Sequence, residues 1–261
     1  MISIKQGDVR NRLLQALDPD AFAYLQPQMK RTELPVRTYT VKSMQTITRV
    51  CFLESGLASK VATNPGGASV EVGHVGREGM TGYTVVLHVD KTPVDIFMQV
   101  EGHGIFIPAD HLMQGIADGV LPQDLFLRYA HVCDVQLAQS VLANAQYTMH
   151  QRLARWLLMC HDRIENDDMP LTHEFLAIML GVRRAGVTGQ LHILEGMHAI
   201  KSTRGLVRIL DRTILEKIAG DSYGTSEREY DRWIGTPFTD AAHADVGGEL
   251  TGAQLRSGSK G

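Results

Sequence analysis

The fold is decided by residues 171–194, which read LTHEFLAIMLGVRRAGVTGQLHIL. In the first half of this stretch, apolar residues recur at helical spacing behind Thr172, a residue type that commonly caps helix N-termini. Gly181 then permits a tight turn, because glycine adopts backbone conformations that other residues avoid. A second apolar stripe follows at Val187 and Leu191. The segment therefore predicts two helices joined by a short glycine turn.

The second helix, expected over about residues 182–194, has a polar face opposite its apolar stripe. An arginine can donate two hydrogen bonds to the O6 and N7 atoms of guanine, while hydroxyl and amide groups reach phosphates or other base edges. This face therefore has the chemistry of a helix that reads DNA in the major groove. Its residues are Arg183, Arg184, Thr188 and Gln190.

Charge is distributed unevenly along the chain. Residues 171–215 hold six arginines and lysines against three acidic residues, a net +3, while the whole chain of 261 residues has a net charge of −3. The remainder must then carry −6, which excludes a uniformly basic nucleic-acid coat and indicates a basic segment on an acidic body. Residues 202–205 form a predicted turn between two strand-like pieces. We expect Thr172, Lys201 and Arg204 to add DNA contacts beside the recognition helix.

The chain before this segment is rich in β-formers from about residue 34 to 108. Residues 64–67, Asn-Pro-Gly-Gly, form a strong turn, and short strands at near-regular spacing predict a β-roll of the jelly-roll type. A helical lead-in over residues 8–30, broken at Asp18, precedes it. The expected strands lie within residues 39–43, 48–56, 57–67, 69–76, 83–89, 94–102 and 104–108.

A long helix over residues 123–149 is predicted after Pro122, because the forty or so residues that follow contain neither glycine nor proline. Residues 151–164 are expected to form the helix that opens the second domain. Apolar residues recur in the long helix every seven positions, with alanines three positions after two of them, which is typical of close helix–helix packing. We expect this seam to form a homodimer interface, although the same stripe could instead pack on the β-roll of its own chain. The seam consists of Val135, Ala138, Leu142, Ala145 and Met149.

These segments predict an α+β protein with four parts. Residues 1–122 form a β-roll sensor domain, residues 123–149 a dimerisation helix, and residues 150–235 a winged helix-turn-helix domain. Residues 236–261 are rich in Gly, Ala and polar residues without periodicity, so we expect a disordered tail. The odd number of cysteines, three, favours reduced thiols, and no leader or membrane span is apparent. We therefore expect a cytoplasmic protein that has no contact with membranes.

The order of these parts resembles the Crp/Fnr family of bacterial transcription regulators over about residues 10–225. The most specific match is LTHEFLAIMLGVRRAGVTGQL followed by STRGLVRILDRTILEKIA. The resemblance implies a homodimer that binds a pseudo-palindromic operator in double-stranded DNA, with RNA polymerase and a small-molecule effector as further candidate partners. By position, Arg184 matches the family's guanine-contacting arginine, and Arg183 and Thr188 flank it. Ala185 and Gly189 stand where many members have a glutamate and an arginine that also contact bases, so the usual operator is not expected.

The β-roll segment VEVGHVGREGMTGY sits where this family keeps its effector cassette, which makes Gly76, Glu78, Gly79 and Met80 candidate pocket residues. Cyclic-nucleotide-binding members hold the phosphate with an arginine and a nearby glutamate, but residues 78–127 contain no arginine here. A buried cyclic phosphate would lack its cation, so we do not expect cyclic AMP to bind in the usual mode.

No cofactor, metal or enzymatic activity is expected. The first fifty residues contain no cysteine for an iron–sulfur cluster, and the histidines form no recognisable ligand pair. The H-E-x-x-H motif, the P-loop and the G-x-G-x-x-G motif are all missing from the sequence. One alternative of a different class stays open: a small-molecule-binding or protein-interaction module of the same fold whose winged helix reads DNA weakly or no longer specifically.

Overall fold

Two antiparallel four-stranded sheets form the N-terminal half of the computed structural model, which describes residues 4–235 and residue 238. The strand orders are β1-β8-β3-β6 and β2-β7-β4-β5, and the predicted β-roll is thereby confirmed. The strands are β1 (Lys30–Leu34), β2 (Tyr39–Val41), β3 (Arg49–Leu53), β4 (Leu57–Thr63), β5 (Ser69–Val75), β6 (Met80–Thr81), β7 (Val94–Val100) and β8 (Gly102–Pro108).

The helical lead-in consists of two short helices, each begun by a side-chain cap. Asn11 accepts hydrogen bonds from two backbone N–H groups of α1 (Arg12–Gln15), and Asp18 caps α2 (Pro19–Leu25). Both helices contribute leucines to one hydrophobic cluster with strand β3, whose residues 50–53 are fully buried. A strand covered on both faces reads as an unbroken apolar run, as VCFL does here.

The structure corrects two parts of the strand prediction. Residues 83–89 contain η3 (Tyr83–Leu87), a 3-10 helix bounded by left-handed residues at Gly82 and His88. Their β-branched residues are strand formers, but Tyr83 and Val86 are buried by a helical turn that crosses from one sheet to the other, so tertiary packing overrides propensity. Strand β1 was missed because its residues KRTEL are mostly polar and exposed at a sheet edge.

The predicted dimerisation helix, residues 123–149, ends three residues early. Helix α4 spans Gln123–Gln146, and α5 spans Met149–His161. Thr148 starts α5 with a capping box, in which its hydroxyl accepts from the N–H of Gln151 and the Gln151 side chain accepts from the N–H of Thr148. Placing Met149 on the seam of the dimerisation helix was therefore wrong, because Met149 begins a different helix.

The rest of the predicted seam lies on α4 and faces away from the β-roll. Ala138, Leu142 and Ala145 are exposed and Val135 is half-buried, whereas a different face of α4 is buried. Leu142 keeps 44% of its surface exposed, and the neighbouring Val141 keeps 60%. The alternative that this stripe packs on its own β-roll is thus excluded for its exposed members.

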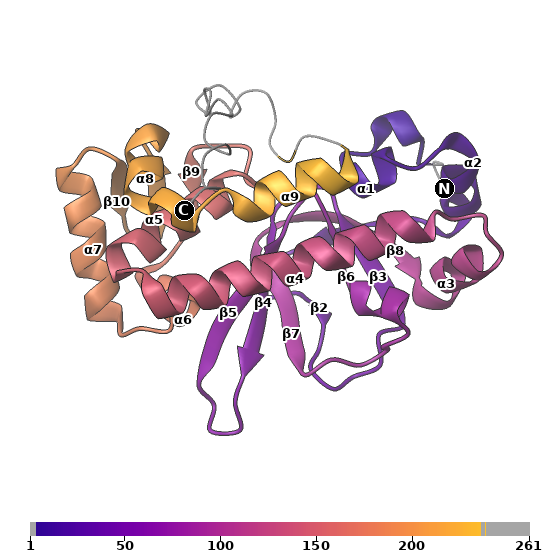
Figure 1. Cartoon of the computed structure of the whole chain (residues 1–261), viewed down its shortest axis with the longest axis horizontal. Coiled ribbons are helices and arrows are strands. Elements are labelled where there is room, and N and C mark those ends of the chain that lie inside the picture. The colour runs from indigo at the N-terminus through magenta and orange to yellow at the C-terminus, as the bar shows by residue number, and fades with distance from the viewer. Residues whose placement is uncertain (1–3, 236–237, 239–261) are drawn as a thin grey trace, which may run out of the picture.

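The C-terminal half contains a second hydrophobic cluster built around a helix-turn-helix and a small sheet of order β10-β11-β9. The cluster also takes in Leu57, Val61 and Val100 from strands β4 and β7, so this half packs directly against one sheet of the β-roll. Figure 1 shows it at the end of the molecule opposite α1 and α2. Its elements after α5 are β9 (Asp168–Met169), α6 (His173–Leu180), α7 (Arg184–Gly196), β10 (Ile200–Thr203), β11 (Leu206–Ile209) and α8 (Arg212–Ala219).

The last described helix, α9 (Thr225–Ile234), returns to the β-roll and runs beside α4 (Figure 1). Tyr230, Ile234 and Phe238 belong to the first hydrophobic cluster, and the Tyr230 hydroxyl donates a hydrogen bond of 2.8 Å to the carbonyl oxygen of Glu78. The winged-helix domain was expected to extend to residue 235. Its last helix, α9, instead packs in the hydrophobic core of the N-terminal half. Apart from Phe238, the predicted tail lies outside the described residues.

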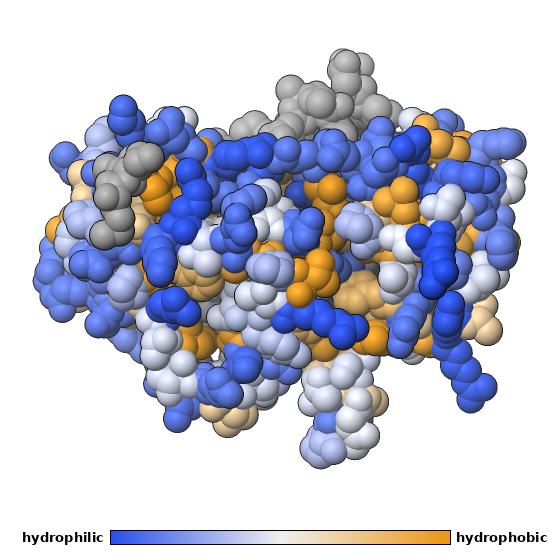
Figure 2. Space-filling model, turned by 180° about the vertical axis from the view of Figure 1, so that it is seen from behind, coloured by the Kyte–Doolittle hydropathy of each residue, from blue (hydrophilic) through white to orange (hydrophobic). Residues whose placement is uncertain are grey.

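The remaining helices are short: α3 (Ala109–Ala117) links β8 to α4, and η1 (Gln6–Asp8), η2 (Gln26–Gln28) and η4 (Gly220–Ser222) are single 3-10 turns. Figure 2 shows that the face opposite to Figure 1 is mostly hydrophilic, with apolar side chains gathered in separate small areas. Within residues 4–235, no helix combines the length and the apolar character that crossing a membrane requires.

We predict that Tyr230→Ala lowers the free energy of unfolding by about 3–5 kcal/mol, since it removes a fully buried ring and leaves a cavity. Urea denaturation followed by circular dichroism measures this. Arg228→Ala on the exposed side of the same helix is the control and should change stability by less than about 0.5 kcal/mol. Equal, small effects of both substitutions would show that α9 does not pack on the β-roll in solution.

Candidate functional site

The helix-turn-helix has the local structure that its sequence indicates. The Thr172 hydroxyl accepts a hydrogen bond of 3.1 Å from the N–H of Phe175, so the predicted N-cap of α6 is confirmed. Gly181 ends α6 in the left-handed region, with a φ of 64°. Helix α7 starts at Arg184, two residues later than expected, and Arg183 is an N-cap without a side-chain hydrogen bond. The first two N–H groups of α7, those of Arg184 and Ala185, therefore have no capping side chain.

One face of helix α7 is buried, and the opposite face contacts no other part of the chain at its glycines. Val187, Leu191 and Leu194 are at most 1% exposed and lie in the second hydrophobic cluster. On the other side, a Cβ atom added at Gly186 or Gly189 would meet no atom within 4 Å. Nothing in the protein itself therefore requires glycine at these two positions, and the outer face of α7 is accessible to a partner.

Four of the basic side chains at this end, those of Arg183, Arg184, Lys201 and Arg204, form no ion pair within the described residues, whereas Arg208 on β11 pairs with Asp168. Arg183 and Arg184 are exposed at the start of α7. Lys201 and Arg204 are exposed on the wing formed by β10 and β11. A groove of about 730 Å³ separates α7 from the wing, and both Arg184 and Arg204 line it. The structure thus brings three of the predicted DNA-contacting residues, Thr172, Arg184 and Arg204, to one groove.

Gln190 and Thr188 are already engaged within the chain. The Gln190 side-chain oxygen lies 3.1 Å from the Nδ1 atom of His150 on α5, so this amide points toward the body of the protein. The Thr188 hydroxyl donates to the carbonyl oxygen of Arg184 and lies 3.0 Å from the Nδ1 atom of His173. His173 was missed in the sequence because a lone histidine at a helix start carries no motif.

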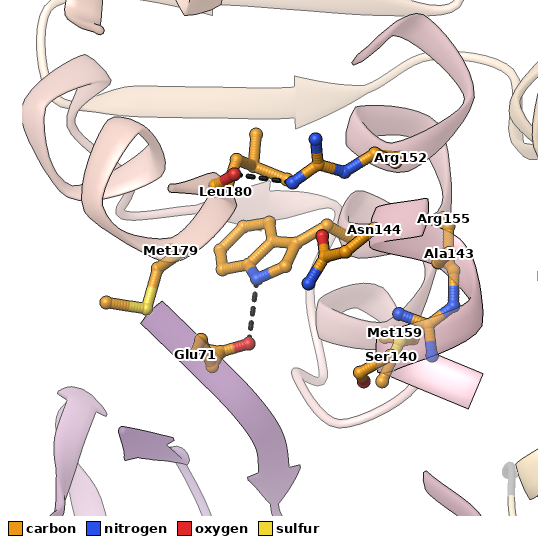
Figure 3. Close-up of a pocket in the computed structure, with 10 residues that line it drawn as sticks. Glu71, Ser140, Ala143, Asn144, Arg152, Arg155, Met159, Met179 and Leu180 are labelled. Atoms are coloured by element: carbon orange, nitrogen blue, oxygen red, sulfur yellow. Dashed lines mark hydrogen bonds between the residues drawn. The ribbon is translucent and has the colours of Figure 1, made fainter. Parts of the chain in front are cut away.

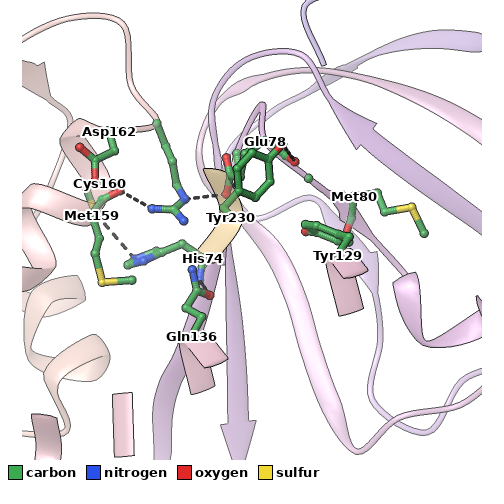
Figure 4. A network of polar contacts seen from close by, with 12 residues as sticks. His74, Glu78, Met80, Tyr129, Gln136, Met159, Cys160, Asp162 and Tyr230 are labelled. Carbon is green, nitrogen blue, oxygen red and sulfur yellow. Dashed lines mark hydrogen bonds and ion pairs between the residues drawn. The ribbon is translucent and has the colours of Figure 1, made fainter. Parts of the chain in front are cut away.

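The four residues predicted to line an effector pocket lie together, but the chain fills the space around them (Figure 4). A Cβ atom at Gly79 would lie 2.0 Å from the Tyr129 hydroxyl oxygen, and one at Gly76 would lie 2.8 Å from a side-chain carbon of Arg163. Met80 is fully buried, and its carbonyl oxygen accepts a hydrogen bond from Tyr129. These glycines are required because tyrosine and arginine side chains approach the backbone closely.

Glu78 is paired inside the protein with a cation from the other half. The Nε atom of Arg163 lies 2.8 Å from a carboxylate oxygen of Glu78, and the two side chains are 1% and 6% exposed. Burial alone would lower the pKa of the Arg163 guanidinium, but the surrounding carboxylates, with Glu78 foremost, raise it above its ordinary value. The Arg163 guanidinium also stacks over the Phe238 ring, at 4.7 Å from the centroid.

A half-buried cation, Lys60, lies between β4, η3 and α4. The Lys60 ammonium donates a hydrogen bond of 2.6 Å to the Tyr83 hydroxyl, and burial lowers the pKa of Lys60. Burial also raises the pKa of the adjacent Cys133 thiol to about 11, which keeps the thiol protonated. No sequence pattern indicated this cluster, since Lys60 is a single charge within a strand.

One cavity at the junction of the two halves, bordered by Glu71, Arg152 and Leu180, has a volume of about 30 Å³ (Figure 3), and a more open hollow of about 570 Å³ lies beside it between the β4–β5 hairpin and Leu180. One oxygen of Glu71 accepts from the Trp156 indole N–H at 2.9 Å, and the other accepts from the Ser59 hydroxyl at 2.6 Å. The smaller space suits one or two water molecules and is far below the size of ordinary ligand pockets. Within the described part of the chain, no group of three or more His, Cys, Asp or Glu side chains could hold a metal ion.

We predict that Arg163→Met lowers the free energy of unfolding by about 3–5 kcal/mol, because it leaves the Glu78 carboxylate buried without its partner. The double variant Arg163→Met/Glu78→Gln should lose less than the sum of the single variants, as a double-mutant cycle in urea would measure. Arg10→Met breaks the half-exposed pair with Glu165 and serves as the control, with an expected cost below about 1 kcal/mol. Additive losses at 78 and 163 would contradict the pairing.

Comparison with known proteins agrees with this arrangement. A family model described as the Crp-like helix-turn-helix domain matches residues 151–218. A search of curated protein sequences finds no match.

Several solved structures are similar to the chain in fold. One, from Eubacterium rectale, is described as a transcriptional regulator of the Crp/Fnr family; it has a TM-score of 0.63 and 17% identity over 79% of this chain and 97% of its own. A CRP-family regulator from Thermus thermophilus has a TM-score of 0.60 and 17% identity over 75% of this chain and 98% of its own. A c-di-GMP-responsive global regulator from Xanthomonas campestris has a TM-score of 0.57 and 16% identity over 80% and 100%. The resemblance noted in the sequence is thereby confirmed: residues 151–218 form a Crp-like helix-turn-helix domain, and the chain has the fold of the Crp/Fnr-type transcription regulators.

Proposed function

We propose that this protein is a DNA-binding transcription regulator that acts as a homodimer on a pseudo-palindromic operator. The observation that carries the proposal is the pair Arg183 and Arg184, exposed and without an ion pair among the described residues, at the start of a helix whose opposite face is buried. The uncapped N-terminus of α7 adds the positive end of the helix dipole at the same place. Exposed cations and uncapped N–H groups at the same helix end suit a polyanion.

Within this proposal, the basic residues divide into two roles. Arg184 lies in the first turn of α7, from which an arginine can reach guanine in the major groove. Lys201 and Arg204 project from the wing and would contact phosphates, which position the protein without reading sequence. Gln190 is the weakest of the predicted contacts, because its amide is bonded to His150.

The second subunit would dock on the exposed face of α4. Ala138 and Ala145 are small residues that allow a close approach of two helices, and Leu142 and Val141 supply exposed apolar surface. Such a two-fold arrangement would present two recognition helices to two half-sites.

Cyclic AMP binding in the usual mode is not part of the proposal. Residues 78–127 contain no arginine, and the Glu78 carboxylate already holds Arg163. A regulator that binds DNA without an effector, and is controlled by its own abundance, fits these two observations.

A second function of a different class is favoured by one observation. Ala185, Gly186 and Gly189 present almost no side chain on the accessible face of α7, so base contacts would come from few residues. The alternative is a module of the same fold that binds a protein or small molecule and reads DNA only weakly.

We predict that Arg184→Ala weakens binding to the preferred duplex by about 1–3 kcal/mol and relaxes base choice at one position of each half-site. The preferred duplex is obtained by selecting a random pool on the purified protein and sequencing the bound fraction at two salt concentrations. Lys201→Ala is the matched control: it should weaken all duplexes equally and reduce the salt slope by about one. Unchanged affinity and base choice in Arg184→Ala would favour the alternative module.

We further predict that Leu142→Glu converts a dimer into a monomer, because the introduced carboxylate would be buried against the second subunit. Sedimentation equilibrium measures the mass. Val36, which is 51% exposed on the β-roll, provides the control Val36→Glu, and this variant should remain dimeric. A monomeric wild type, or a Leu142→Glu variant that is still dimeric, would refute the proposed interface.

A further inference from the structure

His173 lies where three elements of the proposed DNA-binding surface meet. It is the first residue of α6, it is half-buried, and it borders the groove between α7 and the wing. Its Nδ1 atom is 3.0 Å from the Thr188 hydroxyl on α7, and its Nε2 atom is 3.2 Å from the Ser202 hydroxyl on β10. One imidazole ring therefore connects the recognition helix to the wing.

The neighbouring hydrogen bonds define the proton positions. The Thr188 hydroxyl donates to the Arg184 carbonyl oxygen at 3.1 Å, so toward His173 it can act only as an acceptor. The Nδ1 atom of His173 must then carry a proton, and in the neutral ring Nε2 accepts from the Ser202 hydroxyl. In the charged ring Nε2 donates, and the Ser202 hydroxyl rotates to accept. Both charge states keep the two bonds, so the ring can take up a proton without leaving its place.

Each element that packs against the His173 ring carries charged or titratable groups. On α7, Arg184, His192 and Glu195 are the groups that act on His173, and Glu174 follows it on α6. On the wing, Arg204 lines the same groove, and the N–H of Ser202 donates to a carboxylate oxygen of Glu195 at 2.8 Å.

In the free protein these surroundings favour the neutral ring. Burial, followed by the positive charge of Arg184 and of His192, lowers the pKa of His173 below its ordinary value, and Glu195 opposes them only in part. A phosphate in the groove would reverse this balance, since an anion close to the ring favours the imidazolium.

Resting on the proposed function, we propose that His173 is a positioning residue that joins the recognition helix to the wing and binds a proton when DNA phosphates enter the groove. Because binding and protonation are linked, a pKa that is higher in the complex than in the free protein makes DNA bind more tightly as the pH falls. The effect is limited to about tenfold in affinity per pH unit for each half-site, which corresponds to one proton.

The test is the dissociation constant of the full chain for its selected duplex between pH 5.5 and 8.5 at constant ionic strength. We compare the wild type with His173→Gln, whose amide does not titrate but is long enough to reach Ser202. His192→Gln is the matched control, because His192 borders the same groove but is 70% exposed and is paired only with Glu195. Carboxylates ordinarily titrate below this range, and lysines and arginines above it.

We expect wild-type affinity to rise by about three- to tenfold per pH unit below pH 7. His173→Gln should lose most of this slope, and His192→Gln should keep it. Equal slopes in wild type and His173→Gln, or a wild-type affinity that does not depend on pH, would overturn the proposal while leaving DNA binding itself intact. A wild type that binds no duplex at any pH would instead refute the proposed function, and this inference with it.

A second measurement covers the case in which His173→Gln does not fold. The ring resonances of His173 are followed by NMR in the wild type as the pH is changed, with and without the duplex. The proposal requires a higher pKa in the complex, and an unchanged or lower pKa would refute it.

Discussion

The ion pair between Glu78 and Arg163 is the interaction on which the relation of the two halves depends. It joins the turn after β5 to the end of α5, and both side chains are almost completely buried. Two such charges are stable inside a protein only if their remaining hydrogen-bonding capacity is also met. Here the same carboxylate oxygen also accepts from the N–H of Gly76, and Arg163 donates to the carbonyl oxygen of Met159. The pair therefore fixes the orientation of the helix-turn-helix relative to the β-roll.

Other contacts across the same junction reinforce this orientation. Strand β4 contributes Leu57 and Val61 to the hydrophobic core of the C-terminal half, and Glu71 binds both Ser59 and Trp156. A junction that combines an apolar core with hydrogen-bonded polar groups resists rotation more than a flexible linker does. In the proposed dimer, the spacing of the two recognition helices would then be set by the packing of each chain rather than by a ligand.

The sequence was sufficient to predict those features that depend only on residues close together in the chain. The cap at Thr172, the left-handed turn at Gly181 and the buried stripe of α7 are local, and all three were predicted correctly. The end of the dimerisation helix was placed at residue 149 instead of 146, because a threonine cap leaves no glycine or proline as a signal. The Glu78–Arg163 pair joins residues 85 positions apart, and the docking of Tyr230 spans 152 positions, so no single-sequence pattern could find either. The same limit explains why His173 was overlooked, since its partners lie 15 and 29 residues away.

The return of α9 to the β-roll also has a consequence for the order in which the protein assembles during translation. Tyr230, Ile234 and Phe238 are part of the same core as Leu13 and Phe52, which are made first. Domains of a growing chain usually fold as units from the N-terminus onward. Here the strands of the β-roll are synthesised well before Tyr230, whose hydroxyl donates to the carbonyl oxygen of Glu78. The first domain to be translated is thus completed last, after the winged helix has already been made.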